Sequence, residues 1–322
     1  MEQPRVVIKD VLLRDGLQNL DEFVPTEIKL TLFRMILASG IQQIQFTSFV
    51  SPKAVPQFRD ATQLAQAVVP ITPAGVEPSA LVPNLKGAQL ALEVGVRHLE
   101  FVMSVSESHN LNNVRRTTGE SLDELKRIVE WKERYPGTGV TGGLATVFGC
   151  PFEGTIDPER VLQFIARYHA LGIRSVSIAD TVGTGNPKQV REVTRRCVSD
   201  FPDVTFSIHL HNTRGLGCAN AYAAYESGFR IFDGAIGGLG GCPFAPGATG
   251  NTATEDLVFM FEEMGCGTGV GLDKVLDVAR YLPTVKQDVK FASSLLSAGV
   301  PKPLGPLTET IRCLYPLSAD QT

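Results

Sequence analysis

The sequence has little of the features that mark several large protein classes. Its six cysteines lie far apart with no C-x-x-C spacing, which argues against zinc-thiolate sites and favours reduced thiols. No apolar run reaches the length of a membrane span, and Met1 to Pro4 form no charged-then-apolar leader. A net charge of −4 offers no attraction for nucleic acid or for a membrane surface. We therefore expect a cytoplasmic protein with no nucleic-acid or membrane partner.

Histidine is also scarce, yet two of the five histidines stand at positions 209 and 211 in an apolar segment. Side chains at i and i+2 of a strand point to the same face. Both imidazoles could then bind one divalent metal ion, since His is the commonest protein metal ligand. An isolated His-x-His pair is more often two histidines partly buried at a strand end, so neighbouring residues must decide.

Short β-branched runs alternate with helical patterns such as 121–134 and 158–171. This alternation indicates parallel strands joined by crossover helices, and eight units favour an α/β (β/α)₈ TIM barrel over an open sheet. We expect the barrel to span residues 1–271. A C-terminal extension, 272–322, would add one helix and pack on the barrel as a lid or dimer contact. The eight expected strands are 6–8, 41–47, 80–82, 98–103, 140–146, 174–178, 204–210 and 230–236.

In such a barrel the chemistry lies at the carboxyl ends of the strands. Asp15 follows the first expected strand, His209 and His211 end the seventh, and Asn251 follows the eighth. Their oxygen and nitrogen donors suit Mg²⁺ or Mn²⁺ better than a metal that prefers thiolates. Ligand type alone leaves Zn²⁺ open. The sequence thus predicts a divalent metal site on the rim.

Several segments of the chain resemble the hallmark segments of the 3-hydroxy-3-methylglutaryl-CoA lyase family. The resemblance runs from about Val6 to Gly271 and extends to the Claisen-type acyl-CoA synthases of the same superfamily. The segments that carry it are 13–19 (LRDGLQN), 47–53 (TSFVSPK), 83–87 (PNLKG), 149–151 (GCP), 180–183 (DTVG), 238–247 (GLGGCPFAPG) and 250–257 (GNTATEDL).

This resemblance implies cleavage of a 3-hydroxy-3-carboxymethyl acyl-CoA to acetyl-CoA and a 3-oxo acid, acetoacetate in the parent case. By resemblance, the metal ligands are Asp15, His209, His211 and Asn251. A metal chelated by the substrate hydroxyl and carboxylate would lower the hydroxyl pKa and orient the substrate. An acyl-CoA substrate and a homodimer are implied as partners.

Three further residues have catalytic roles by resemblance, each with a structural alternative. Arg14 would neutralise the thioester oxygen as an enolate forms, or form only a salt bridge with Asp10 or Asp15. Cys242, in a glycine-rich loop, would exchange a proton at the enolate carbon, or be a small buried residue. Asp180 would relay the hydroxyl proton, or cap the next helix. His209 is counted with the catalytic residues as well as with the metal ligands.

A wider set of rim residues is expected to contact the substrate or its CoA moiety. Ser48 and Ser177 would contribute hydrogen bonds. Segment 106–110 resembles a synthase loop that approaches the acyl group, although a polar surface loop is equally compatible. The substrate contacts are Asp10, Gln45, Ser48, Ser177, His109 and Arg214, and the CoA contacts are Lys53, Asn84 and Lys86.

The chain departs from the lyase pattern at three positions. Gln45 stands where the lyases carry Glu, and Asp10 stands where they also carry Glu. An Asp-Thr-Tyr-Gly pattern becomes 212–215, Asn-Thr-Arg-Gly. Two carboxylates are lost and Arg214 is gained, so the pocket is less acidic. We hypothesise that Arg214 meets an extra anion or polar group of a related substrate.

Two rival functions remain open. A condensing enzyme would join acetyl-CoA to a 2-oxo acid, but the Gly-Gly-Cys-Pro loop at 240–243 and the absence of a long C-terminal regulatory domain argue against it. A catalytically silent barrel would retain metal poorly, which the complete ligand set argues against. The sequence does not decide the acyl chain, the metal or the direction of the reaction.

Overall fold

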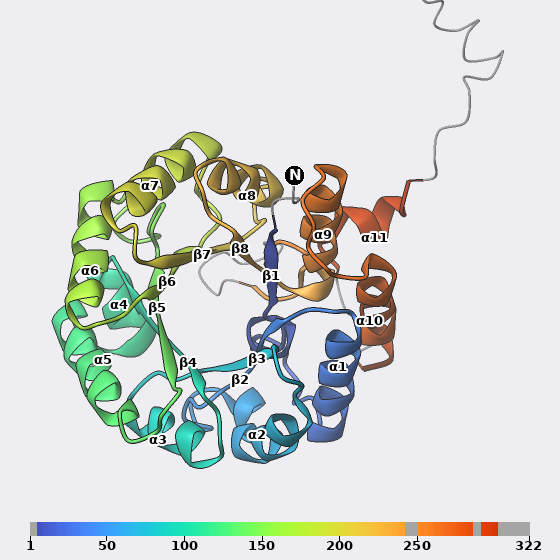
Figure 1. The fold of residues 1–322 in the computed structure, drawn as a ribbon, viewed down its shortest axis with the longest axis horizontal. Helices are drawn as coiled ribbons and strands as arrows, with labels where there is room; N and C mark the ends of the chain where they lie inside the picture. The colour runs from blue at the N-terminus through green and yellow to red at the C-terminus, as the bar shows by residue number, and fades with distance from the viewer. Residues whose placement is uncertain (1–4, 242–249, 286–290, 302–322) are drawn as a thin grey trace, which may run out of the picture.

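The computed structural model describes residues 5–241, 250–285 and 291–301. Eight parallel strands pair in chain order and close into a barrel, because β1 pairs with both β2 and β8 (Figure 1). The predicted (β/α)₈ barrel is confirmed: each of the eight strands overlaps its expected range, although β3 begins three residues earlier than expected. The strands are β1 (Val7–Asp10), β2 (Gln43–Ser48), β3 (Glu77–Leu81), β4 (His98–Ser104), β5 (Gly139–Ala145), β6 (Ser175–Asp180), β7 (Thr205–Leu210) and β8 (Ile231–Gly234).

A ring of helices surrounds the barrel (Figure 1). Local signals fix many helix starts: Thr117 and Glu120 form a reciprocal cap at α5, and Asn186 and Gln189 do so at α7. The α-helices are α1 (Thr26–Ala38), α2 (Ala61–Val68), α3 (Leu85–Glu93), α4 (Glu107–Val114), α5 (Thr118–Lys132), α6 (Pro158–Ala170), α7 (Pro187–Asp200), α8 (Gly217–Glu226), α9 (Thr254–Glu263), α10 (Leu272–Val285) and α11 (Ser294–Ala298). Short turns of other helix types in the described residues are η1 (Leu12–Gly16), η2 (Pro56–Phe58), η3 (Val69–Ile71) and η4 (Ile236–Gly238).

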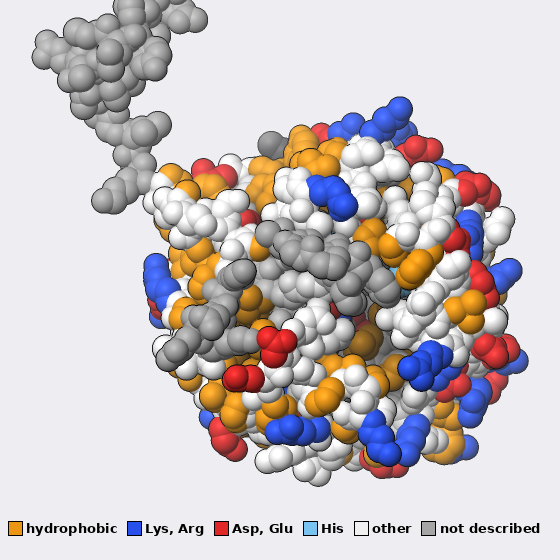
Figure 2. Space-filling model, turned by 180° about the vertical axis from the view of Figure 1, so that it is seen from behind, with side chains coloured by type: hydrophobic (Ala, Val, Ile, Leu, Met, Phe, Trp, Pro, Cys, Tyr) orange, Lys and Arg blue, Asp and Glu red, His pale blue; other side chains and the backbone are white. Residues whose placement is uncertain are grey.

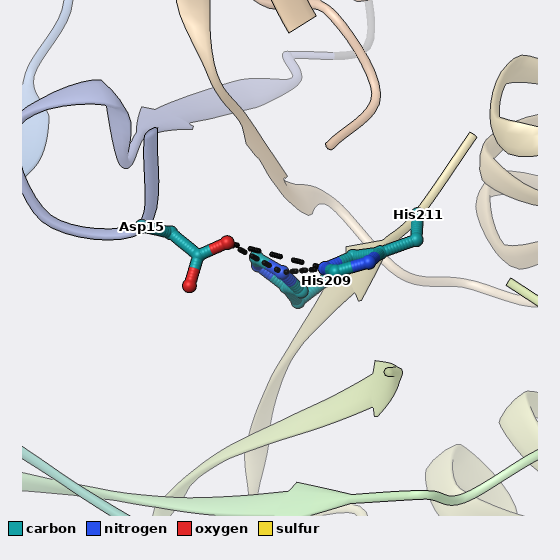
Figure 3. A group of neighbouring side chains, drawn as sticks. All are labelled: Asp15, His209 and His211. Carbon is teal, nitrogen blue, oxygen red and sulfur yellow. Dashed lines mark hydrogen bonds and ion pairs between the residues drawn. The ribbon is translucent and has the colours of Figure 1, made fainter. Parts of the chain in front are cut away.

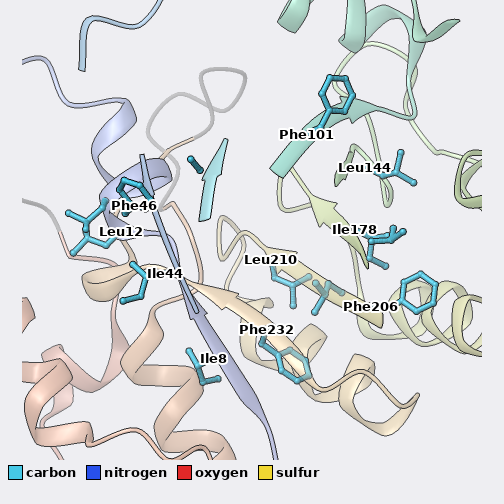
Figure 4. Packing of buried hydrophobic residues seen from close by; sticks show 14 of the residues in the cluster. Ile8, Leu12, Ile44, Phe46, Phe101, Leu144, Ile178, Phe206, Leu210 and Phe232 are labelled. Carbon is cyan, nitrogen blue, oxygen red and sulfur yellow. The ribbon is translucent and has the colours of Figure 1, made fainter. Parts of the chain in front are cut away.

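The hydrophobic core lies between the barrel wall and the helices. Ile8, Ile44 and Phe232 belong to this core and are fully buried (Figure 4). Their strand neighbours, such as Lys9, alternate to the opposite face and point toward the barrel axis. Lys9 and other polar side chains line a cavity of about 280 Å³ at the amino-terminal end of the barrel, where most of the lining residues begin their strands. This end of the barrel interior is therefore polar, whereas apolar branched residues dominate the interior of most such barrels.

The C-terminal part contains α10 and α11 within the described residues, where the sequence predicted one helix. Asp256 of α9 holds the start of α11: its carboxylate accepts hydrogen bonds from the Ser293 hydroxyl (3.0 Å) and from the Ser294 and Leu295 amides (2.9 Å each). This polar anchor explains how such a short helix docks. The boundary at residue 271 and the roles as lid or dimer contact stay predictions. In the described part of the chain, no helix is both long and apolar enough to cross a membrane.

Candidate metal centre and active site

The turn after β1 brings Arg14 and Asp15 to the carboxyl end of the barrel. Residues Leu12 to Gly16 form one turn of π-helix, η1, directly after β1. Such turns are rare and frequently occur at functional sites. Figure 2 shows a hollow near the centre of one face of the molecule.

Asp15, His209 and His211 converge at this end of the barrel (Figure 3). One potential ligand atom from each lies within 4.8 Å of the other two. The Nε2 atoms of His209 and His211 are 3.1 Å apart, and Asp15 Oδ2 lies 3.9 Å and 4.0 Å from them. Three of the four ligands implied by the resemblance are thus brought together from two distant segments.

The electrostatics of this cluster suit a cation. Burial opposes ionisation of Asp15, but the charges of Arg14, His209 and His211 together hold its pKa well below the usual range. Burial, reinforced by the neighbouring His209, lowers the pKa of His211 to about 4. Near neutral pH the site therefore presents an anionic carboxylate and a neutral imidazole at His211, the protonation states in which both residues bind metal ions.

Asn251 joins the cluster through its amide group. A β-bridge pairs it with His211, and its Nδ2 donates to Asp15 Oδ2 and to the Leu239 carbonyl, both at 2.8 Å. Its Oδ1 is buried and has no hydrogen-bond partner among the described residues. The two facing imidazole nitrogens and this oxygen are donors that a divalent cation would satisfy, so the residues fit the implied metal. That Asn251 is a ligand stays a prediction.

A glycine allows the loop after β8 to approach this site closely. Gly240 has φ of 114°, and a Cβ there would lie 2.4 Å from Asn251 Nδ2. Any larger residue would displace Asn251 or strain the backbone. Cys242, the thiol predicted to be catalytic, lies outside the described residues.

Arg14 is held between two oxygen acceptors. Its Nε donates to Gln45 Oε1 and its Nη1 donates to Asp15 Oδ1. The salt bridge to Asp15 that was the structural alternative is present, and it fixes the guanidinium beside the metal cluster. Gln45 contributes no charge there, so Asp15 is the one carboxylate that Arg14 contacts in the described residues.

Asp10 and Asp180 both accept hydrogen bonds from backbone amides of the rim loops. Asp10 accepts hydrogen bonds from the Leu12 and Ile236 amides and from Thr254. The Asp180 carboxylate accepts the Thr184 and Gly185 amides, both at 3.0 Å. Burial raises the pKa of each, to about 7 for Asp10.

These contacts bear on the roles predicted for the two acids. Asn186, not Asp180, caps the following helix α7, so the capping alternative was wrong in detail, although Asp180 does organise the loop before that helix. Both carboxylates shape the loops around the site. Substrate contact by Asp10 and proton relay by Asp180 stay predictions.

Arg214 also links two rim loops. Its Nη1 donates to the Val182 and Gly183 carbonyls, at 2.9 and 2.8 Å. Its charge lowers the pKa of Asp180, in opposition to the larger effect of burial. The Nη1 edge of the guanidinium is thus used in hydrogen bonds within the protein.

His109 is not on a surface loop. Segment 107–114 forms α4, capped by Ser106, and His109 is buried with its Nδ1 2.7 Å from Ser104 Oγ. The interpretation as a polar surface loop was wrong, because an N-cap Ser followed by Glu is itself a helix-start signal. Ser48 is fully buried near the rim, with no partner for its hydroxyl in the described residues. Ser177 shares its strand face with Ser175, which lines the cavity at the amino-terminal end of the barrel.

The residues predicted to contact CoA lie in the turn after β2 and at the start of α3. Asn84 caps α3 by accepting the Gly87 amide at 2.8 Å. Lys53, in the turn after β2, and Lys86, at the start of α3, are exposed. Their contact with CoA stays a prediction.

The sequence reading missed three buried ionic residues, Lys9, Glu100 and Asp233. Lys9 Nζ lies 3.0 Å from Glu100 Oε2 and 3.2 Å from Asp233 Oδ2, which in turn lies 3.3 Å from His209 Nδ1. The signal was available in part, because Asp233 lies within the expected eighth strand, 230–236, beside the strand that carries the histidines.

Glu255, in the first turn of α9, was noted only as part of a family segment. It is fully buried, accepts the Gly237 amide at 3.1 Å, and has its pKa raised to about 7 by burial. Since the folded pKa exceeds the unfolded one, its contribution to stability is full below pH about 4.5 and is lost as the pH rises through 7.

Glu255→Gln should therefore stabilise the protein relative to wild type as the pH rises. The difference should approach roughly 3 kcal/mol at pH 8 and be small at pH 4.5. Thermal melting of both proteins across this range measures it. A difference that does not change with pH would contradict the assignment of a buried, protonated Glu255.

The HMGL-like family model matches residues 5–282, most of the chain. The chain belongs to the HMGL-like family. Hydroxymethylglutaryl-CoA lyase YngG of Bacillus subtilis is 41% identical over 278 residues, 86% of this chain and 92% of that protein. The (R)-citramalyl-CoA lyase of Chloroflexus aurantiacus is 39% identical over 321 residues, 97% of this chain and 96% of that protein. These HMGL-like relatives are carbon–carbon lyases.

A solved HMGL-like structure agrees with the fold. An HMG-CoA lyase from Acinetobacter baumannii, in complex with coenzyme A and 3-methylmalate, has a TM-score of 0.88 and 42% identity. The match covers 94% of this chain and 98% of that one. The family resemblance read from the sequence segments is confirmed.

Proposed function

We propose that the protein is a divalent-metal-dependent carbon–carbon lyase that cleaves 3-hydroxy-3-methylglutaryl-CoA, or a close 3-hydroxy acyl-CoA relative, to acetyl-CoA and an oxo acid. The observation that carries this proposal is the convergence of Asp15, His209 and His211 beside the guanidinium of Arg14. The relatives named above act on CoA esters of this kind. Mg²⁺ or Mn²⁺ fits the donor set best, although Zn²⁺ also takes His and carboxylate ligands.

The reaction breaks the bond between the carbinol carbon and the CH₂ next to the thioester. When bound, the metal supplies Lewis acidity to the substrate hydroxyl and carboxylate. Arg14, fixed by Gln45 and Asp15, offers a permanent positive charge to the thioester oxygen as it becomes an enolate. Asp15, His209 and His211 keep this chemistry at the carboxyl end of the barrel. By resemblance, Cys242 exchanges the proton at the enolate carbon.

A second candidate substrate is citramalyl-CoA. The citramalyl-CoA lyase match extends over 97% of the chain, beyond the 86% matched by YngG. In citramalyl-CoA the carboxylate sits directly on the carbinol carbon, so cleavage of the same bond yields acetyl-CoA and pyruvate. Because Gln45 is neutral, it offsets less of the positive charge of Arg14 than a Glu would. This extra positive charge favours a substrate with an anion close to the reacting carbon.

Purified protein with Mg²⁺ or Mn²⁺ should be incubated with each CoA ester, and the products followed by mass spectrometry. We expect metal-dependent acetyl-CoA, with acetoacetate identifying the first substrate and pyruvate the second. A chelated sample should give neither. A folded, metal-loaded protein that cleaves neither ester would contradict the proposal, and free CoA formed from acetyl-CoA plus a 2-oxo acid would favour the condensing rival.

Arg214→Tyr tests the hypothesis of an extra substrate anion. If Arg214 meets that anion, the ratio of kcat/KM for citramalyl-CoA over 3-hydroxy-3-methylglutaryl-CoA should fall by about tenfold or more, as for one lost charged hydrogen bond. Because Arg214 also holds two carbonyls, both substrates should lose some rate. An unchanged ratio would show that Arg214 holds the rim loops together and does not contact the substrate.

We also propose a homodimer in the cytoplasm, with residues 272–322 as an extension of the barrel. The resemblance supports the dimer, and the scattered cysteines without metal-binding spacing support a reducing compartment. Light scattering on the purified full chain measures the oligomeric state, and a monomer at micromolar concentration would contradict it.

A further inference from the structure

We propose that Asp233, braced by Lys9, is a positioning residue that orients the imidazole of His209 for metal binding. The inference rests on the proposed function only in taking Asp15, His209 and His211 as the metal ligands.

The contact between Asp233 and His209 is built into the barrel. The two residues are Cα partners in the register of β7 and β8, and Asp233 is likewise paired with Lys9 in β1. Asp233 Oδ2 lies 3.3 Å from His209 Nδ1 and 3.2 Å from Lys9 Nζ. One carboxylate oxygen thus joins three neighbouring strands, and rigid strands place side chains more accurately than loops do.

Lys9 keeps this carboxylate in place inside the barrel. Burial opposes its charge, but Asp233 and Glu100 together raise its pKa, so it is a cation. Glu100 is fixed in turn by the Ser79 hydroxyl, which donates to its Oε1 at 2.5 Å. A buried carboxylate without a charged partner is costly, whereas here Asp233 Oδ2 lies beside both the Lys9 ammonium and His209 Nδ1.

The consequence for His209 is a fixed tautomer. A carboxylate beside Nδ1 favours the proton there, which leaves the Nε2 lone pair directed at the cluster where His211 Nε2 lies 3.1 Å away. Metal-binding histidines usually donate the other ring N–H to such an acceptor, and losing it typically weakens metal affinity. The buried Lys9–Asp233 pair inside the barrel would thus fix the orientation of a metal ligand.

Calorimetric titration of the metal-free full chain with Mn²⁺ tests the proposal. Asp233→Asn keeps the shape and removes the charge, and Asp233→Ala removes the acceptor. We expect roughly 10- to 100-fold weaker Mn²⁺ binding, with the larger loss for Ala. Asp203→Asn is the matched control, because Asp203 accepts from His169 Nε2 at 2.9 Å on the surface. It should leave Mn²⁺ binding unchanged.

A measurement on the wild type avoids the risk that a variant fails to fold. Nitrogen-15 NMR of labelled histidines reports the tautomer, and we expect His209 protonated on Nδ1. Protonation on Nε2 alone in the metal-free protein near neutral pH would overturn the proposal, as would Asp233→Asn with wild-type melting and wild-type Mn²⁺ affinity. A wild type that binds Mn²⁺ but cleaves neither CoA ester would refute the proposed function and leave this inference standing.

Discussion

His211→Ala is expected to lower the rate of carbon–carbon cleavage by about 10³-fold or more. A metal that polarises the reacting oxygen contributes several kcal/mol to the transition state, and each 1.36 kcal/mol is a factor of ten. His211 is nearly fully buried, and its Nε2 lies in the cluster with Asp15 and His209. Its removal leaves two of the three convergent donors. Mn²⁺ affinity should fall together with the rate.

The matched control is His169→Ala, which removes a histidine paired with Asp203 at the surface. It should retain wild-type rate and metal affinity. Raising the Mn²⁺ concentration should restore part of the rate of His211→Ala, because the defect is weaker binding rather than lost folding. A His211→Ala protein with wild-type melting, rate and affinity would show that the metal lies elsewhere.

Much of the site could be predicted because, in a closed barrel, the order of the strands in the chain determines which residues lie next to each other at the carboxyl end. Asp15 and Asn251 are 236 residues apart, yet both follow strands that become neighbours when β8 pairs with β1. Once eight strand–helix units were recognised, the rim residues had to meet at one end. The period-2 pattern also placed both histidines on one face before any fold was known.

The buried ionic residues were harder to predict because they contradict the usual pattern. Lys9 alternates with apolar Ile8, which in a half-buried strand indicates a solvent-facing side chain. The strand is instead enclosed on both faces, and Lys9 finds Glu100 and Asp233 on strands far away in sequence. The Asp233 partner follows from the register of β1 with β8, and the Glu100 partner from a contact between the unpaired strands β1 and β4, neither of which a single sequence reveals.

Departures from the lyase pattern could be located in the sequence but not interpreted. Gln45 was recognised as a lost carboxylate, but the structure was needed to show that its oxygen accepts from Arg14. Likewise, Arg214 was predicted to contact the substrate, and the structure was needed to show that its Nη1 also donates to two backbone carbonyls. Side-chain direction at a loop depends on local turns that composition does not fix.

Arg14→Lys should lower kcat by about 10²- to 10³-fold, the usual effect of removing one donor from a developing oxyanion. Lysine keeps the charge but not the planar fork that contacts Gln45 and Asp15 together. The ammonium would pair with Asp15 and would no longer donate a hydrogen bond to the thioester oxygen. The steady-state rate of acetyl-CoA release measures the effect, and Mn²⁺ affinity should change far less than kcat.

Arg174→Lys is the control for this change, since Arg174 pairs with Asp203 on the surface and should tolerate it. The pattern across variants separates the two functions at the rim. Loss of affinity and rate together marks a metal ligand, as expected for His211→Ala, whereas loss of kcat with retained affinity marks a group that acts on the enolate. If Arg14→Lys lost metal affinity as strongly as rate, Arg14 would be a brace for Asp15 and the enolate would need another cation.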